Sequence, residues 1–297
     1  MRGATGYGEL LDALRGVTWP ARRTARASTS GTHRSRLRGV SPEFTEYRPY
    51  RQGDDPRRLD WRLLARTDRA YLRITSDRAT LSTLILVDAS ASMAFPQKSL
   101  GKWEQARRLA IGLAGVAHAS GDPVAVGVAT PHGTIRTEPR TRRGVVTDCA
   151  RVLDAASPGG DVELGDAMQD LRESPLGRAR RLAVLSDFLG NVEAMLQPAR
   201  ALLSEGGEVT AIHIVAREEL DPAPDAILAT DPEDDAIKRA LTPETVGAYV
   251  QQFADWREWL AREWRAAGAQ YEMTVTDEAP ERVIRRIARG EREALTQ

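Results

Sequence analysis

Three oxygen-bearing side chains at alternate positions follow the first long apolar segment of the sequence. The segment Leu81–Val87 is almost continuously apolar, and Asp88, Ser90 and Ser92 come directly after it. In a loop between a strand and a helix, one carboxylate and two hydroxyls at this spacing can all turn toward one point. Oxygen ligands of this kind suit Mg²⁺ above all, or another hard divalent cation such as Mn²⁺ or Ca²⁺. The pattern therefore predicts a divalent-cation site that begins at Asp88.

Two further acidic residues follow turns or strand-like segments. Asp187 comes after the apolar segment 182–186, and Asp161 comes after Gly159-Gly160. Ligands of open α/β sheets bind beyond the carboxyl ends of the strands. Asp187 is therefore predicted to add a second carboxylate, directly or through water, and Asp161 is a candidate neighbour of the ion. The alternative is structural, because Asp and Ser are also preferred helix N-caps and Asp161 can be a plain turn residue.

The elements that must position these residues alternate along the chain. Strand patterns cover 81–87, 124–129, 182–186, 209–215 and 271–275, with a short partner at 134–137. Helix patterns cover 102–118, 142–155, 164–172, 193–204, 243–267 and 280–288. This alternation predicts an α/β domain over residues 81–297 with a doubly wound, mostly parallel sheet. The stretch 217–240, rich in Asp, Glu and Pro, is predicted to be an exposed loop.

Residues 1–80 have a different character and are predicted to form an appended N-terminal subdomain. A helix pattern covers 7–15, and short strands are expected between 44 and 75. By count these 80 residues contain 17 arginines, no lysine and 9 acidic residues, although the whole chain has a formal net charge of zero. Binding of nucleic acid through the Arg-rich residues 15–38 is one alternative function. It is not favoured, because the segment is short and the protein is neutral overall.

Two sequence signatures together resemble a known family. The D-x-S-x-S pattern of Asp88, Ser90 and Ser92 resembles the first motif of the metal-ion-dependent adhesion site of von Willebrand factor A domains. Upstream, EYRPYRQGDDPRRLDWR at residues 46–62 resembles the signature of a bacterial A-domain family, domain of unknown function 58. The resemblance runs from about residue 30 to the C-terminus. It implies a von Willebrand factor A (Rossmann-like) fold, with Asp187 as the third motif of the site.

The second motif departs from the pattern of these domains. A threonine normally follows the Gly-Gly turn, whereas Asp161 stands there in this sequence. If the Asp161 carboxylate turns inward, it adds negative charge and the ion binds more tightly. If it turns outward, a hydroxyl ligand is simply missing and the site is weaker. The inward case is slightly favoured, because an aspartate beside two glycines is free to reach the ion.

The resemblance also implies a function. Members of this family are often linked to MoxR-type AAA+ ATPases, which implies a non-enzymatic adaptor or co-chaperone that helps to assemble or remodel other proteins. Eight residues of the upstream signature are candidates for partner binding: Arg48, Tyr50, Asp54, Asp55, Arg57, Arg58, Asp60 and Trp61. The alternative is structural, since aspartates among arginines can form bidentate pairs that pin the N-terminal segment to the sheet.

An enzyme is the remaining alternative. A metal-dependent phosphotransferase or phosphatase could keep a nucleophile at Asp88, but it would need a second carboxylate two residues later, where Ser90 stands. Neither serine lies in a G-x-S-x-G elbow, and the sequence contains no P-loop. The four histidines show no mutual metal-ligand spacing, and His213 lies within an apolar strand.

The sequence has one cysteine, no apolar stretch long enough to span a bilayer and no secretory signal. A cytoplasmic protein is therefore expected.

Overall fold

Contacts divide the chain into two units. The computed structural model describes residues 5–21, 43–51, 59–76, 81–173, 181–222, 228–230, 238–240 and 243–290. The larger unit consists of Met1–Thr24 with Leu81–Gln297, and the smaller unit consists of Ala25–Thr80. The larger unit thus resumes at Leu81, where the α/β domain was predicted to begin. It also includes the first 24 residues, which the prediction had assigned to the N-terminal subdomain.

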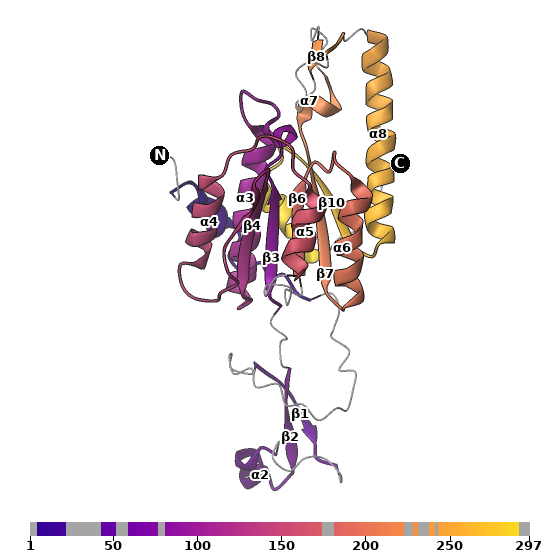
Figure 1. The fold of residues 1–297 in the computed structure, drawn as a ribbon. Coiled ribbons are helices and arrows are strands. Elements are labelled where there is room, and N and C mark those ends of the chain that lie inside the picture. The colour runs from indigo at the N-terminus through magenta and orange to yellow at the C-terminus, as the bar shows by residue number, and fades with distance from the viewer. Residues whose placement is uncertain are drawn as a thin grey trace. The chain divides into compact units, whose positions relative to one another are not determined.

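The larger unit is built on a six-stranded sheet with the order β10-β7-β6-β3-β4-β5 (Figure 1). All neighbouring strands are parallel except β5, which pairs antiparallel with β4. When these six strands are renumbered in chain order, the sheet reads 3-2-1-4-5-6 from β5 to β10, which is the doubly wound order. The direction in which successive strands are added reverses between β3 and β6. The predicted α/β class is confirmed. The strands are β3 Thr83–Asp88, β4 Val124–Thr130, β5 Gly133–Arg136, β6 Arg181–Ser186, β7 Glu208–Val215 and β10 Gln270–Val275.

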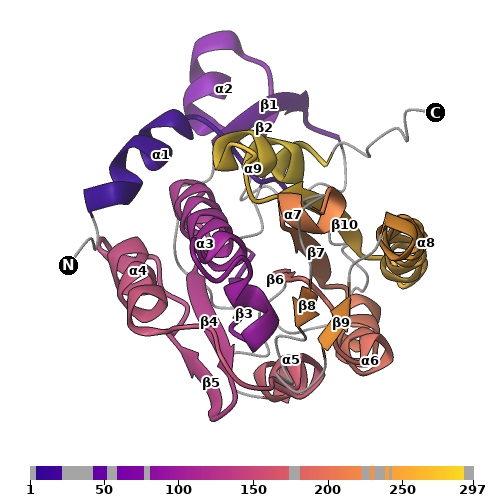
Figure 2. The ribbon, with the colours of Figure 1, turned by 90° about the horizontal axis from the view of Figure 1, so that it is seen from above.

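Helices cover both faces of this sheet (Figure 2). One face carries α1 Gly8–Ala13, α3 Gly101–Ala119, α4 Val145–Ala155 and α9 Pro280–Arg289. The other face carries α5 Leu164–Glu173, α6 Val192–Ser204 and α8 Pro243–Ala266. Successive side chains of a strand point to opposite faces, so a central strand between two helical layers must be apolar on both. Accordingly, Ile85 and Val87 enter one hydrophobic core, while Leu84 and Leu86 enter the other.

The first helix belongs to the larger unit because its apolar side packs on α3. Leu14 is buried, and Leu10 and Leu11 pack against the same core. Two glycines of α3 make room for them, since a Cβ at Gly112 would lie 3.1 Å from Leu14 and one at Gly115 would clash with Leu11. The sequence pattern showed the helix, but it did not show which surface the helix covers.

The smaller unit contains the predicted short strands as a two-stranded antiparallel sheet, and a helix that was not predicted from the sequence. β1 Glu43–Pro49 pairs with β2 Tyr71–Ser76, and α2 spans Trp61–Thr67. Asp60 is the N-cap of α2, and its carboxylate accepts hydrogen bonds from the backbone N–H groups of Arg62 and Leu63. These two bonds satisfy two of the free N–H groups at the start of the helix.

The prediction of a loop over 217–240 is wrong for part of that stretch. It contains the helix α7 Arg217–Leu220 and the antiparallel pair β8 Leu228–Thr230 with β9 Lys238–Ala240. Elements of three or four residues are too short to produce a readable periodicity, and the acidic composition conceals them.

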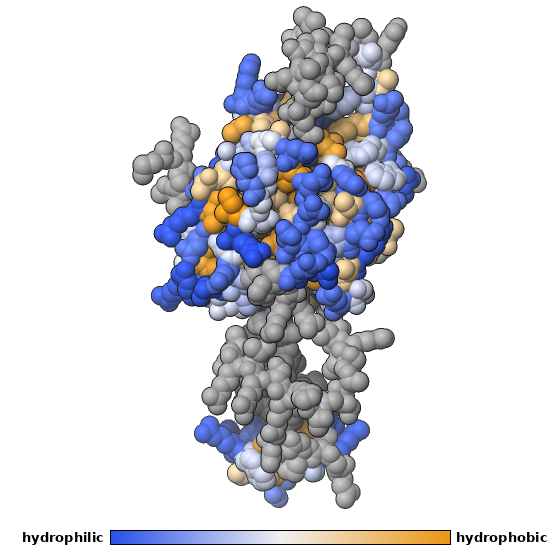
Figure 3. Space-filling model, in the orientation of Figure 1, coloured by the Kyte–Doolittle hydropathy of each residue, from blue (hydrophilic) through white to orange (hydrophobic). Residues whose placement is uncertain are grey.

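The surface of the larger unit is mainly hydrophilic on the face seen in Figure 3, with smaller hydrophobic areas among the charged residues. Of the helices that the structure describes, none combines the length and the apolar composition needed to cross a bilayer.

Candidate metal centre

The candidate site lies where β3 and β6 end side by side. The two strands are parallel neighbours, with Val87 opposite Leu185. Their carboxyl ends therefore bring the residues after each strand together, at the point where the strand order reverses. The Ser186 hydroxyl donates a hydrogen bond of 2.6 Å to Asp88 Oδ2. The predicted meeting of the Asp88 loop with the 186–187 segment is thus present in the structure.

The loop after β3 is tightly closed on itself. Asp88, Ser90 and Ser92 are all buried. The Ser90 N–H donates to Asp88 Oδ1 at 2.8 Å, and the Oγ atoms of Ser90 and Ser92 share a hydrogen bond of 3.1 Å. Ser90 precedes a short 3₁₀ helix, Ala91–Ala94, but its side chain makes no capping hydrogen bond to it. Helix capping therefore does not explain this serine.

Asp187 also has no helix-capping role. Its Oδ1 accepts the N–H of Leu189 at 3.4 Å, which is a local turn contact. The following helix, α6, is capped instead by Asn191, whose side chain accepts the N–H of Ala194. Asp187 is buried next to Ser186 at the end of β6, so its carboxylate lies among the residues of the site.

The Gly-Gly turn reaches the site through its backbone. The carbonyl of Gly160 accepts the N–H of Ala91 at 2.8 Å, and the N–H of Gly159 donates to the carbonyl of Ala89 at 2.9 Å. Asp161 itself is exposed. The expectation of an inward carboxylate is corrected, and the outward alternative describes the structure. Gly160, which precedes Asp161, adopts a φ of +69°, a left-handed conformation that favours glycine.

Two charged residues complete the site and were missed in the sequence. Lys102, in the first turn of α3, is only 1% exposed. Its Nζ lies 2.9 Å from Asp187 Oδ2 and 2.5 Å from Oε1 of Glu219 on α7. Glu219 in turn accepts the N–H of Ala216 at 2.7 Å. One sequence signal was available for Lys102, because a lysine in the first turn of a helix opposes the helix dipole.

The two aspartates of the site differ in how their charge is balanced. Burial, together with the negative charge of Asp187, raises the pKa of Asp88 to about 6. Asp88 makes no ion pair with any residue in the described part of the chain, whereas Asp187 is paired with Lys102. Burial acts to lower the pKa of Lys102, but the charges of Asp187 and Glu219 outweigh it and raise that pKa.

These residues fit a hard divalent cation. The metal-ligating atoms that the Asp88 loop offers are oxygen atoms only. Its buried negative charge is balanced by hydrogen bonds, without an ion pair to any residue that the structure describes. An ion bound there would offset the cost of that charge. Within the described ranges there is no cluster of three His, Cys, Asp or Glu residues with metal-ligand geometry. An ion bound here would therefore need serine hydroxyls as well as carboxylates as ligands.

His213, on β7, is buried behind the site and serves packing. Its Nδ1 lies 2.6 Å from the Tyr271 hydroxyl, and the rings of Phe188 and Trp256 meet it edge-on. Burial, aided by the positive charges of Lys102 and Arg257, lowers the pKa of His213 to about 3.

The neutral state of His213 predicts a pH-dependent stability. Below pH ~6.5 the unfolded chain binds a proton at this residue while the folded protein does not until about pH 3. The free energy of unfolding should therefore fall as pH drops through this window. In His213→Asn, which keeps a polar atom near the Tyr271 hydroxyl, this contribution should be absent. In urea titrations from pH 7 to pH 4, the free energy of unfolding of the wild type relative to that of His213→Asn should fall by up to ~3 kcal/mol. Parallel pH curves for the two proteins would contradict the assignment.

The candidate residues of the smaller unit fall into three groups. Asp60 has the structural role of capping α2. Trp61 is 64% exposed, and Arg48 and Tyr50 are partly buried. Asp54, Asp55, Arg57 and Arg58 lie outside the described residues. The exposure of Trp61 keeps it as a candidate for contact with a partner.

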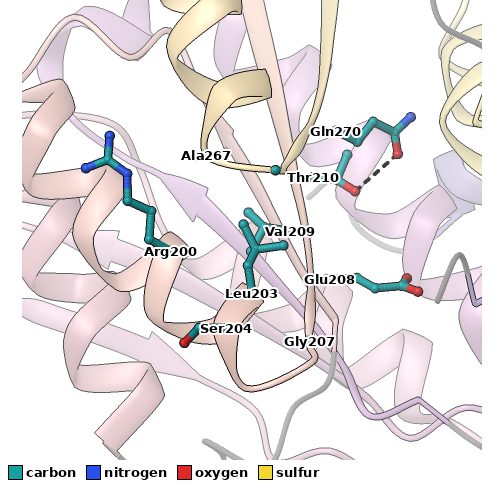
Figure 4. A pocket seen from close by; sticks show the side chains of 10 residues that line it. Arg200, Leu203, Ser204, Gly207, Glu208, Val209, Thr210, Ala267 and Gln270 are labelled. Carbon is teal, nitrogen blue, oxygen red and sulfur yellow. Dashed lines mark hydrogen bonds between the residues drawn. The ribbon is translucent and has the colours of Figure 1, made fainter. Parts of the chain in front are cut away.

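A separate pocket of about 370 Å³ lies at the amino-terminal ends of β7 and β10 (Figure 4). Thr210 and Gln270 are hydrogen-bonded to each other at 3.3 Å in its wall. The Asp88 loop follows the carboxyl end of β3, so this pocket lies toward the opposite ends of the parallel strands. The sequence did not predict it, and it contains none of the predicted ligands. Its lining residues are Arg200, Leu203, Ser204, Gly207, Glu208, Val209, Thr210, Ala267, Gly268 and Gln270.

Comparison with known proteins gives a family match and distant relatives. Residues 46–255 match the family described as "Protein of unknown function DUF58". Two similar relatives are the uncharacterized proteins Rv1480 of Mycobacterium tuberculosis and Mb1516 of Mycobacterium bovis. Each is 27% identical over 282 residues, which cover 93% of this chain and 88% of the relative.

Solved structures with a similar fold include proteins of diverse origin. The conserved hypothetical protein BatB from Bacteroides thetaiotaomicron is 18% identical with a TM-score of 0.44, over 71% of this chain and 98% of that one. The SpRpn10 VWA domain is 9% identical with a TM-score of 0.40, over 69% and 94%. Proximal thread matrix protein 1 from the mussel byssus, with a zinc-occupied MIDAS motif, is 21% identical with a TM-score of 0.36, over 46% and 38%. These similarities concern the fold alone.

Proposed function

The chain belongs to the DUF58 family, and we propose that it is a non-enzymatic, divalent-metal-dependent adaptor or co-chaperone whose partner is a MoxR-type AAA+ ATPase. One observation carries the metal-dependent part of this proposal. Asp88 is a buried carboxylate without an ion-pair partner among the described residues, and it lies beside two buried hydroxyls at the switch point of the sheet. The ATPase part rests on the resemblance of the two sequence signatures.

Each residue of the site has a distinct task in this proposal. Asp88 supplies the charge that holds the ion, and Ser90 and Ser92 supply neutral oxygens. Ser186 fixes the orientation of the Asp88 carboxylate through its 2.6 Å hydrogen bond. A bound divalent ion supplies an electron-poor centre that attracts an oxygen ligand from another molecule. Because few ligand charges come from the protein, the site favours a partner that brings its own acidic group.

The surroundings of the site favour a protein partner. Phe95 and Leu189 are two of the exposed large apolar residues of the chain. Both adjoin the site, because the Phe95 ring lies 5.7 Å from Lys102 Nζ and the Leu189 N–H donates to Asp187. Exposed apolar side chains around a polar centre are typical of surfaces that dock another protein.

The enzyme alternative receives less support from the same residues. A phosphotransferase with Asp88 as nucleophile would need a nearby general acid and base. Ser90 stands where that carboxylate would be, and its hydroxyl is engaged with Ser92. Glu219 is held by Lys102, and the low pKa of His213 keeps its imidazole from carrying a proton near neutrality. We therefore propose binding, and no reaction, at this site.

The proposal is tested by affinity capture from native cell extract, followed by mass spectrometry. We expect the wild type to retain a MoxR-type ATPase in the presence of magnesium and to lose it with a chelator. Asp88→Asn should lose it in either condition. Asp161→Asn removes the same charge from an exposed position in the adjoining turn and should bind as the wild type does. Equal capture by Asp88→Asn, recovery of nucleic acid alone, or phosphatase activity on generic substrates would overturn the proposal.

A further inference from the structure

We propose that Lys102 is a resident cation that competes with the divalent ion for Asp187 and thereby sets the metal affinity of the site. This inference rests on the proposed metal-dependent function. It concerns a residue outside the D-x-S-x-S motif, and it makes the two predicted carboxylate ligands unequal.

The contacts of Lys102 place a positive charge inside the site. Its ammonium group lies 2.9 Å from Asp187 Oδ2 and 2.5 Å from Glu219 Oε1, and the lysine side chain is 1% exposed. A buried ammonium group must be paired, and each carboxylate here satisfies part of that need. The other oxygen of Asp187 accepts the Leu189 N–H, so both of its oxygens are held by donors of the chain.

Asp88 is held differently. Its two oxygens accept hydrogen bonds from the Ser90 N–H and the Ser186 hydroxyl, which are neutral donors. An incoming cation can therefore use Asp88 without displacing another positive charge. To use Asp187 it must share that carboxylate with Lys102. Asp88 is thus the primary charged ligand. The more weakly Lys102 binds Asp187, the more readily the ion can use Asp187 as a second ligand.

The charges of the site also indicate that Lys102 lowers the metal affinity. Asp88, Asp187 and Glu219 carry three negative charges when ionised, and Lys102 carries one positive charge, which leaves a net charge of −2. A divalent ion brings the sum to zero. Lys102 both neutralises one ligand and repels the incoming ion, so each effect lowers the affinity. Removing the ammonium group should reverse both effects at once.

Helix stability does not account for this lysine. Lys102 stands in the first turn of α3, where the positive end of the helix dipole disfavours a cation. The favourable partners that the structure gives it are the two carboxylates, with the Phe95 ring 5.7 Å away. Its position therefore follows from the charges of the site.

The test compares four metal-stripped proteins by calorimetric titration with Mn²⁺ and Mg²⁺: the wild type, Lys102→Met, Glu219→Gln and the double variant. Methionine keeps the length of the side chain and removes the charge. Lys102→Met should bind Mn²⁺ at least about tenfold more tightly than the wild type. Glu219→Gln should bind more weakly, because Lys102 then pairs with Asp187 alone. The double variant should bind more tightly than the wild type, and it covers the case in which unpaired carboxylates prevent Lys102→Met from folding.

The thermal midpoint separates this role from a structural one. Without metal, Lys102→Met should melt at a lower temperature than the wild type, because the buried Asp187 and the partly buried Glu219 lose their shared partner. A structural lysine would lower stability and metal affinity together, whereas a competing lysine lowers the first and raises the second. This inference alone would be overturned if the wild type binds metal and both proteins that carry Lys102→Met bind it with the same affinity. Absence of binding in all four proteins would instead overturn the metal-dependent function on which it rests.

Discussion

Replacement of Arg181 by methionine should lower the free energy of unfolding by about 3–5 kcal/mol. Arg181 is fully buried at the start of β6. Its Nε lies 3.1 Å from Glu208 Oε2, and its Nη1 lies 3.5 Å from Asp122 Oδ2. Methionine fills much of the same space but leaves two largely buried carboxylates without this cation. The destabilisation comes mainly from those unpaired charges rather than from lost packing.

The same substitution should also loosen the N-terminal segment. Arg181 donates a hydrogen bond to the Pro20 carbonyl at 3.1 Å and stacks on the Trp19 ring at 4.3 Å. Urea unfolding measures the loss of stability, and amide hydrogen exchange over residues 5–21 measures the loosening. Arg200→Met is the matched control, because its partner Glu193 is exposed; the change should be within about 0.5 kcal/mol. Equal effects of the two substitutions would show that the buried ion pairs of Arg181 do not stabilise the protein more than an exposed ion pair does.

Asp88→Asn should stabilise the metal-free protein and abolish metal binding. Burial and the nearby Asp187 charge make ionised Asp88 costly, as its raised pKa of about 6 indicates. The neutral amide removes that cost, so the free energy of unfolding at pH 7 should rise by ~1–3 kcal/mol in the presence of a chelator. With millimolar Mg²⁺ the order of stability should reverse, because the wild type alone gains from binding.

The control for this prediction is the exposed Asp161. Asp161→Asn should change neither the stability nor the metal titration, since its carboxylate lies in solvent. A less stable Asp88→Asn protein that still binds metal would show that the Asp88 charge is compensated by other means. Such a residue would serve the structure of the loop rather than an ion.

The sheet could be predicted from the sequence, because a strand that is buried on both faces needs consecutive apolar residues. β3 is apolar from Leu84 to Val87 and buried throughout, which distinguishes a central parallel strand from a strand with one solvated face. Asp88, Ser90 and Ser92 were found for a related reason, since their spacing is contained within five residues. Asp187 was found because strand ends of a parallel sheet meet at one edge.

The roles of the other site residues do not follow from a short-range sequence pattern. Lys102 meets a carboxylate 85 residues further along the chain, and this pairing depends on where α3 begins. Glu219 lies in a four-residue helix that the acidic composition of its surroundings concealed. Asp161 is exposed, and a Gly-Gly-Asp sequence does not by itself show whether the aspartate faces the loop or the solvent. Such features are set by tertiary contacts, and residue types alone do not specify them.

The packing of α1 against the opposite end of the chain has a consequence for protein synthesis. Arg285 of α9 donates a hydrogen bond to the carbonyl of Ala13, across 272 residues of sequence, and Leu14 and Ile284 share one core. The first helix leaves the ribosome long before α9 exists, so even after α3 is available the part of α1 that meets α9 must remain exposed or in transient contacts. The β1–β2 pair, whose strands are close in sequence, can form in the meantime. We therefore expect nascent chains that stop before residue 280 to be the forms most prone to aggregate and most dependent on chaperones.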